Sequence, residues 1–149
     1  MVLRNANKTQ QQQLETRQAQ LFMQIANQTL HDPAFMNAWA RIRRGEWSNL
    51  EEFMEWRGDQ DSDNFKDVFR VGSLLETIGV IVKESLVDIR LIDSLMAAIV
   101  LDYWEKVGAY AIIEMKDSPN FKGYEAEYLY NELKKYQATN LMLYHPHLA

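Results

Sequence analysis

The sequence predicts an all-α fold, a bundle of six or seven helices with a long N-terminal helix. Three observations support this. Apolar residues recur at spacings of three and four along most of the chain. No segment alternates strictly between apolar and polar residues, and no Asn-Gly or Asp-Gly pair marks a hairpin. The 149 residues include only 6 Gly and 3 Pro, which favours long helices.

The first predicted helix covers about residues 7–30. Leu14, Leu21 and Ile25 follow spacings of seven and four residues, which places them on one broad apolar stripe. The outer face is mostly Gln. Because the turns before Leu14 have nothing apolar to bury, we expect them to fray or to depend on a partner.

The second predicted helix has clear start and stop signals. Asp32 is placed to cap it, Pro33 suits its first turn, and Gly45 ends it. Its expected inner face is Phe35, Trp39 and Ile42.

A short third helix follows. Ser48 and Glu51 have the spacing of a capping box, and Gly58 ends the helix. Its apolar residues are Leu50, Phe53 and Trp56.

The fourth predicted helix, about residues 63–84, carries two glycines. Gly72 and Gly79 are seven residues apart and share a face, next to Glu76. Each costs the helix about 1 kcal/mol relative to Ala. We therefore expect a neighbouring helix or a bulky aromatic side chain to approach closely there. The expected buried face is Phe65, Val68, Phe69, Gly72, Leu75, Gly79 and Val82.

The remaining elements complete a single domain over residues 1–149. Asp88 can cap a short helix over residues 89–96, and a sixth helix over about 97–116 is apolar enough to be central. Ser118-Pro119 begins the last helix, which we expect to end near Gln137. The helical core then spans about residues 33–137, and residues 138–149 form a loose tail.

Composition excludes several functions. The chain has no Cys, which removes disulfides, thiolate zinc sites, iron–sulfur clusters and cysteine nucleophiles. The formal net charge is −5, so a nucleic-acid partner is not expected. Residues 1–44 nevertheless hold six basic and two acidic residues. This basic leading third either arises by chance or faces an anionic membrane or an acidic partner.

Motifs for metals and cofactors are weak, and we expect neither. Asp59, Asp61 and Asp63 have the spacing of a calcium loop, but Arg70 stands where the bidentate Glu belongs. No Glu has a His three residues later, as a dimetal bundle requires, and no glycine-rich phosphate loop occurs. The His-x-His pair at residues 145–147 lies in the expected tail.

Two acidic and four aromatic residues remain as candidates. Glu76 and Glu105 are the acids that we expect near the core, where a carboxylate is usually held by a Tyr hydroxyl, an Arg or a backbone group. Aromatic residues at helical spacing usually form core, but a subset could line a ligand pocket. The residues considered for that pocket are Trp39, Trp56, Tyr103 and Trp104.

Three segments carry a family resemblance. They are LRNANKT (3–9) with QAQLF (18–22), LLETIGVIVK (74–83) and YWEK (103–106). The pattern resembles the prokaryotic proteins grouped as domain of unknown function 4760. The resemblance implies an all-helical domain of unassigned activity, in which Glu76, Gly79, Trp104 and Glu105 belong to the sharpest segments. Together with Gly72 they are the candidates for structural or ligand-facing residues.

The resemblance also raises membrane attachment. Many similar chains carry a membrane helix just before the segment that corresponds to residues 3–9, where this sequence starts. No stretch of about 20 apolar residues and no signal peptide is visible in this sequence. If a span precedes Arg4, then Arg4 and Lys8 place the domain on the cytoplasmic side.

Three hypotheses follow for function. The first is a non-enzymatic, cytoplasmic interaction domain that forms a homo-oligomer through its N-terminal helix. The second is a sensor of an unidentified small ligand, with an aromatic pocket. The third is an enzyme that uses Glu76 or Glu105 in a cleft.

Overall fold

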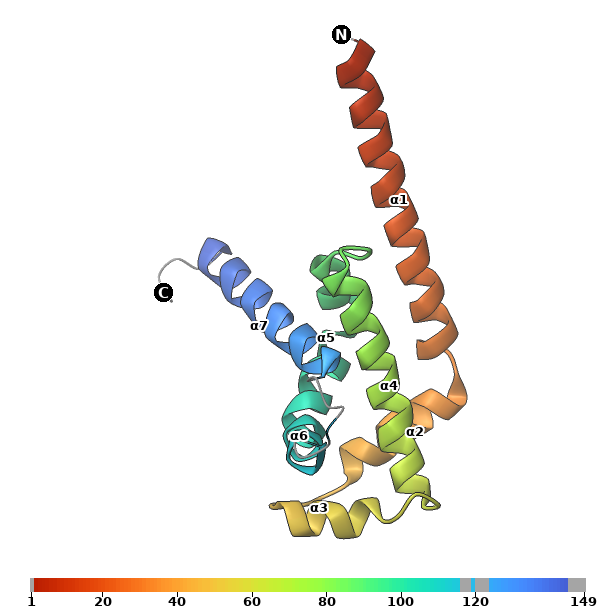
Figure 1. The fold of residues 1–149 in the computed structure, drawn as a ribbon, viewed down its shortest axis with the longest axis vertical. Coiled ribbons are helices and arrows are strands. Elements are labelled where there is room, and N and C mark those ends of the chain that lie inside the picture. The colour runs from red at the N-terminus through yellow and green to blue at the C-terminus, as the bar shows by residue number, and fades with distance from the viewer. Residues whose placement is uncertain (1, 116–118, 120–123, 145–149) are drawn as a thin grey trace.

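The computed structural model describes residues 2–115, 119 and 124–144. Within these residues the chain is helical, without strands, as predicted. Since α5, η1 and α6 follow one another without a gap, the described residues form six helical units (Figure 1). The elements are α1 (Val2–Leu30), α2 (Pro33–Arg44), α3 (Leu50–Arg57), α4 (Asp63–Lys83), α5 (Ile89–Tyr103), the π-helical turn η1 (Trp104–Gly108), α6 (Ala109–Met115) and α7 (Glu125–Tyr144).

The starts of α2 and α5 follow the predicted caps. Asp32 Oδ1 accepts a hydrogen bond of 3.1 Å from the N–H of Ala34, and Asp88 Oδ1 accepts one of 2.8 Å from the N–H of Arg90. These side chains satisfy N–H groups that have no partner within the helix. Both boundaries are therefore set locally.

The predicted cap of α3 is wrong by one residue. Asn49, not Ser48, is the N-cap, and its side chain accepts from the N–H of Glu52 at 3.0 Å. The Glu52 carboxylate in turn accepts from the N–H of Ser48 at 2.6 Å, so Glu51 takes no part. Gly58 ends the helix at a φ of 70°, a conformation that favours glycine.

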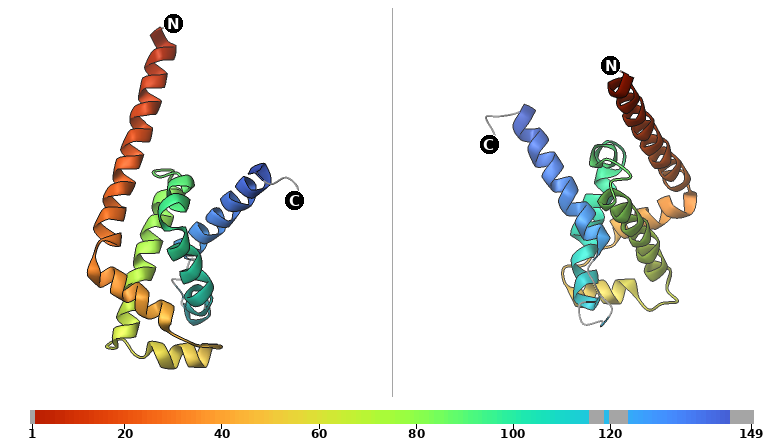
Figure 2. Two further views of the ribbon diagram at one scale, coloured as in Figure 1. Left: turned by 180° about the vertical axis from the view of Figure 1, so that it is seen from behind. Right: turned by 45° about the horizontal axis from the view of Figure 1, so that its top comes forward.

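Helix α4, rather than the 97–116 segment, holds the central position. It packs against α2 on one side and α7 on the other, as the two views of Figure 2 show. The predicted buried face is rotated in its first half, because Asp67 faces α2 there. Phe69 is 68% exposed, contrary to prediction. The buried residues of α4 are Asp67, Val71, Leu75, Ile78, Gly79 and Val82.

The helical run over residues 89–115 is interrupted twice. Met96 has non-helical dihedral angles, at the position where the sequence predicts a break between two helices. Residues 104–108 form a π-helical turn that the sequence did not predict. The buried side chains of the run face α7 and α4.

The C-terminal helix differs from its prediction at both ends. Pro119 lies in a turn, Ser118 lies outside the described residues, and α7 begins at Glu125. It continues to Tyr144, so residues 138–144 are helical rather than part of a loose tail. No Gly or Pro occurs between residues 125 and 144 to stop it.

Helix α1 projects from the rest of the molecule. Its N-terminal half extends past the other helices (Figures 1 and 2). It is helical from Val2, five residues before the predicted start, and no fraying is present in the described residues. Among the described residues, no helix is both long enough and apolar enough to cross a membrane.

Candidate functional site

A cavity of about 390 Å³ lies between α4, η1, α6 and the beginning of α7. Its size falls within the range of small-molecule sites. Aromatic and small apolar side chains form most of its wall, among them Phe65, Phe69, Tyr103, Trp104, Ala111 and Tyr124. Four residues of α4 that were expected in the core thus border this cavity instead: Phe65, Val68, Phe69 and Gly72.

Gly72 allows α5 to approach α4 beside the cavity. A Cβ atom at Gly72 would lie 2.5 Å from the Tyr103 hydroxyl oxygen, which donates a hydrogen bond of 3.1 Å to the carbonyl of Val68. Burial raises the pKa of the Tyr103 phenol. The predicted close approach of a bulky aromatic residue is confirmed here.

Trp104 and Gly108 shape the wall at the π-helical turn. A Cβ atom at Gly108 would lie 2.3 Å from the Trp104 ring, so the indole can lie across this position only because it is glycine. The Trp104 ring is 6.3 Å from the rings of both Tyr124 and Tyr130, measured between centroids. These contacts link η1 to α7.

Glu76 holds the first turn of α7 at the edge of the cavity. Its Oε2 accepts from the N–H of Glu125 at 3.1 Å, and its Oε1 accepts from the N–H of Ala126 at 2.9 Å. One turn further along α4, a Cβ atom at Gly79 would lie 2.2 Å from the carbonyl oxygen of Glu125. The expected backbone partner for Glu76 and the expected neighbouring helix at Gly79 are both confirmed.

Glu105, in contrast, is exposed, so its expected place near the core is wrong. Its Oε1 accepts a hydrogen bond of 3.0 Å from the Tyr130 hydroxyl. Desolvation is the larger cause that raises the pKa of Tyr130, and this hydrogen bond is the second. The hydrogen bond between Tyr130 and Glu105 connects the exposed side of η1 to α7.

Two of the four aromatic residues predicted for a pocket lie elsewhere. Trp39 is 5% exposed and belongs to the core. Trp56 packs against Trp47, with ring centroids 4.6 Å apart, and near Phe53. Tyr103 and Trp104 line the cavity as predicted.

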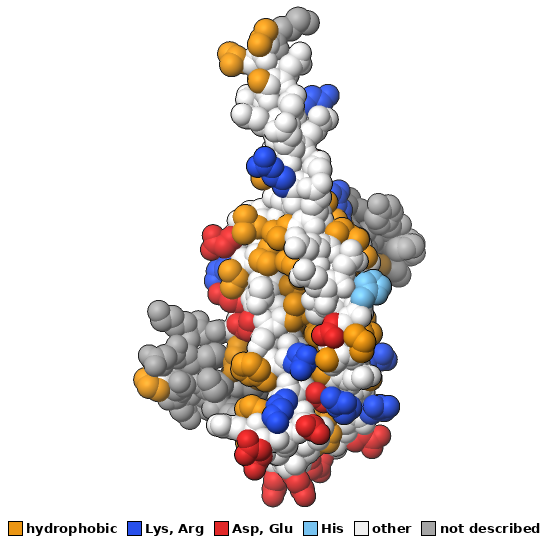
Figure 3. All heavy atoms as spheres, turned by 90° about the vertical axis from the view of Figure 1, so that its right-hand side faces the viewer, with side chains coloured by type: hydrophobic (Ala, Val, Ile, Leu, Met, Phe, Trp, Pro, Cys, Tyr) orange, Lys and Arg blue, Asp and Glu red, His pale blue; other side chains and the backbone are white. Residues whose placement is uncertain are grey.

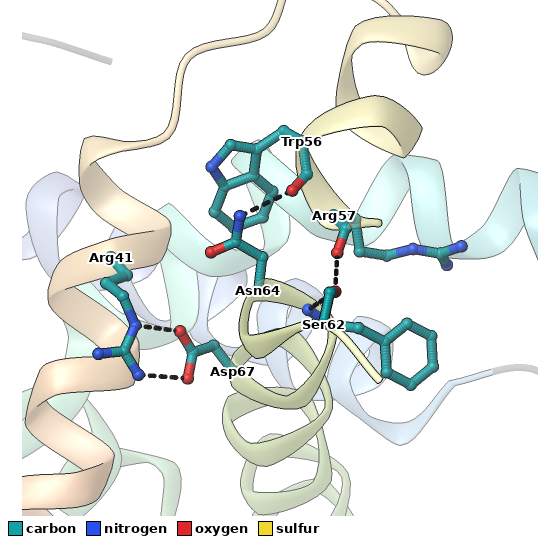
Figure 4. Close-up of polar contacts among 7 residues, drawn as sticks. Arg41, Trp56, Arg57, Ser62, Asn64 and Asp67 are labelled. Atoms are coloured by element: carbon teal, nitrogen blue, oxygen red, sulfur yellow. Dashed lines mark hydrogen bonds and ion pairs between the residues drawn. The ribbon is translucent and has the colours of Figure 1, made fainter. Parts of the chain in front are cut away.

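Among the described residues, the acid that is buried is Asp67, which was not predicted from the sequence. Arg41 of α2 reaches it through two hydrogen bonds of 2.5 and 2.7 Å (Figure 4). The hydrogen bond and charge of Asp67 raise the pKa of the Arg41 guanidinium. The Asp67 side chain is 6% exposed and that of Arg41 44% exposed. Arg41 therefore has a structural role, as the partner of a buried carboxylate.

The connection before α4 is also held by side chains. Ser62 accepts from the N–H of Phe65 at 3.1 Å, and Asn64 Nδ2 donates to the carbonyl of Trp56 at 2.7 Å (Figure 4). Ser62, not Asp63, caps α4. In the part of the chain that the structure describes, no three potential metal ligands cluster, while His145 and His147 lie outside that part.

Comparison with known proteins gives one match. A family model described as Domain of unknown function (DUF4760) matches residues 3–132. No curated protein and no solved structure matches the chain.

Proposed function

The chain belongs to the family Domain of unknown function (DUF4760), and on this premise we propose that it is a non-enzymatic interaction domain that self-associates through α1. The observation that carries this proposal is a row of exposed leucines on α1. The row lies about 100° round the helix from Phe22, which packs against the rest of the domain.

The contact of α1 with its own domain is limited to its second half. Phe22 and Ala26 are buried against the body, where α1 contacts α2 and α5. Gln18 Nε2 donates a hydrogen bond of 2.9 Å to the carbonyl of Ser85. Residues 2–17 are all exposed. A helix that consists of residues 2–17 alone is only marginally stable in water, so contact with a partner would stabilise this part of α1.

The exposed row consists of Leu3, Leu14 and Leu21, which are 80%, 50% and 38% exposed. Their spacings of 11 and 7 residues correspond to about three and two helical turns, so they share one face. Phe22 lies about 100° further round the helix. A second α1 can therefore cover the leucines while the body remains docked.

The chemistry of this face suits a weak homodimer. Asn7 and Gln10 lie between Leu3 and Leu14 on the same face. Polar residues at such positions set the register of paired helices at a cost in stability. Figure 3 shows hydrophobic side chains at the free end of α1 and, below them, Lys and Arg side chains among uncharged ones. Arg4 and Lys8 lie about 100° or more round the helix from Leu3, so these two basic residues would stay outside the contact between two copies.

The proposed absence of catalysis rests on the two candidate acids. Both carboxylate oxygens of Glu76 already accept hydrogen bonds from α7. Glu105 is exposed and bound to Tyr130. Glu76 lines the cavity with both of its oxygens engaged, and Glu105 is not among the residues that line the cavity, so neither is placed as a general base.

We further propose a cytoplasmic location beside the membrane. Arg4 and Lys8 are exposed on the projecting end of α1, where they could face anionic lipid headgroups. Co-sedimentation with vesicles containing phosphatidylglycerol should exceed that with phosphatidylcholine vesicles and should fall with added salt. Equal sedimentation with both would refute this location.

Disulfide trapping tests the α1 pairing directly, because the chain has no Cys of its own. Leu14→Cys places a thiol on the leucine face, and Gln12→Cys places one on the opposite face as a matched control. Mild oxidation should convert Leu14→Cys into a covalent dimer and leave Gln12→Cys monomeric. Equal trapping of both variants, or of neither, would refute pairing through this face.

A further inference from the structure

The cavity beside η1 has features of a ligand site that are independent of self-association through α1. Phe69 stands at its rim with 68% of its surface exposed. A large aromatic side chain left in water on a central helix contributes little to folding. It contributes to binding when a ligand covers it.

Backbone features on the cavity wall also point to a ligand. Gly72 and Gly108 both line the cavity, although glycine weakens a helix. The wall also contains the π-helical turn, and such turns are rare and occur often at functional sites. At η1 the helical geometry therefore changes where the space is formed.

Three polar side chains on the wall already have partners. Glu76 accepts two backbone hydrogen bonds, and Tyr103 donates to the carbonyl of Val68. Arg57 lies over the Phe65 ring at 5.0 Å and donates to the carbonyl of Gly58. The wall holds one positive and one negative side chain, Arg57 and Glu76, so a charged ligand would lose its water and would meet a like charge as well as an opposite one.

From these observations we propose that the cavity binds an uncharged, largely apolar small molecule with a flat aromatic body. The rings of Phe65, Phe69, Trp104 and Tyr124 can pack against the faces and edges of such a molecule. The ligand would also contact Ala126 in the first turn of α7. Its binding therefore stabilises the junction of α4, η1 and α7.

Two dyes that share one skeleton test the proposal on the full chain. N-phenyl-1-naphthylamine is uncharged, and 8-anilinonaphthalene-1-sulfonate adds a sulfonate to the same rings. The neutral dye should bind saturably with one site per chain, and the sulfonate should bind at least about tenfold more weakly. Equal affinity for both dyes would overturn the proposed ligand class, and non-saturable binding of the neutral dye would overturn the site.

Variants assign the bound dye to the cavity. Phe69→Ser removes an exposed wall residue and should weaken binding of the neutral dye about fivefold. Val80→Ser is the matched control, since Val80 is on the same helix, is 46% exposed and lies away from the cavity. Ala111→Phe fills the cavity and should abolish binding. If Ala111→Phe does not fold, Phe69→Ser alone tests whether the dye binds in the cavity. Binding that is unchanged in Phe69→Ser would refute the site.

Discussion

Replacing Glu76 by Ala tests how α7 is attached to α4. The carboxylate accepts hydrogen bonds of 3.1 and 2.9 Å from the N–H groups of Glu125 and Ala126. These groups belong to the first turn of α7, where a helix lacks internal acceptors. The substitution leaves both N–H groups without this partner and removes a negative charge from the positive end of the helix dipole.

The expected loss follows from the burial of these bonds. A hydrogen bond to a charged group contributes about 1.5–3 kcal/mol when it is buried. Glu76 is only half-buried, so water can replace part of both bonds. We expect Glu76→Ala to lower the free energy of unfolding by about 2–3 kcal/mol. Glu76→Gln keeps one carbonyl acceptor and should lose about half of that.

Urea denaturation followed by circular dichroism measures these losses. Glu84→Ala, at the exposed C-terminal end of α4, is the control and should change stability by less than about 0.5 kcal/mol. Hydrogen exchange should also accelerate selectively at the Glu125 and Ala126 amides. A loss below about 0.5 kcal/mol in Glu76→Ala, or unchanged exchange at these amides, would refute the capping role.

Four other substitutions test contacts of the core. Arg41→Ala leaves the buried Asp67 carboxylate without its partner and should lower the free energy of unfolding in urea denaturation. Asp67→Ala should cost less, because the half-exposed Arg41 can regain water; the reverse order would be inconsistent with this burial. Because burial raises the pKa of Tyr103, the unfolded chain loses this proton first, so the free energy of unfolding should fall above pH 10 by up to about 1.4 kcal/mol per pH unit. Tyr103→Phe should flatten that decline in alkaline denaturation curves, and an unchanged slope would contradict it. Gly79→Ala should lower the free energy of unfolding by about 1–3 kcal/mol, because the new Cβ would meet the Glu125 carbonyl, although Ala has the better helix propensity. A variant that is more stable in thermal unfolding would show that α7 can move away.

Features set by neighbouring residues could be predicted from the sequence. Asp32, Pro33 and Gly45 delimit α2 as expected, because capping and chain-stopping act within one turn. Gly72 and Gly79 indicated close approaches, since glycine inside a helix requires compensation. The sequence did not show which neighbour would approach each of them.

Features set by tertiary contacts were missed. Arg41 and Asp67 are 26 residues apart, and no local pattern joins them. Phe69 looked like a core residue because helical periodicity gives the apolar face but not the width that neighbouring helices cover. The π-helical turn inserts a local change of register that a regular period of 3.6 residues does not reveal.

The most direct test of the proposed self-association is light scattering on the full chain at high concentration. The wild-type chain should give the mass of a dimer, and Leu14→Glu, which places a charge on the leucine face of α1, should give the mass of a monomer. Leu95→Glu, at a comparably exposed leucine on α5, should remain dimeric. A wild-type chain that stays monomeric at every concentration, or a Leu14→Glu variant that associates as the wild type does, would contradict the proposal.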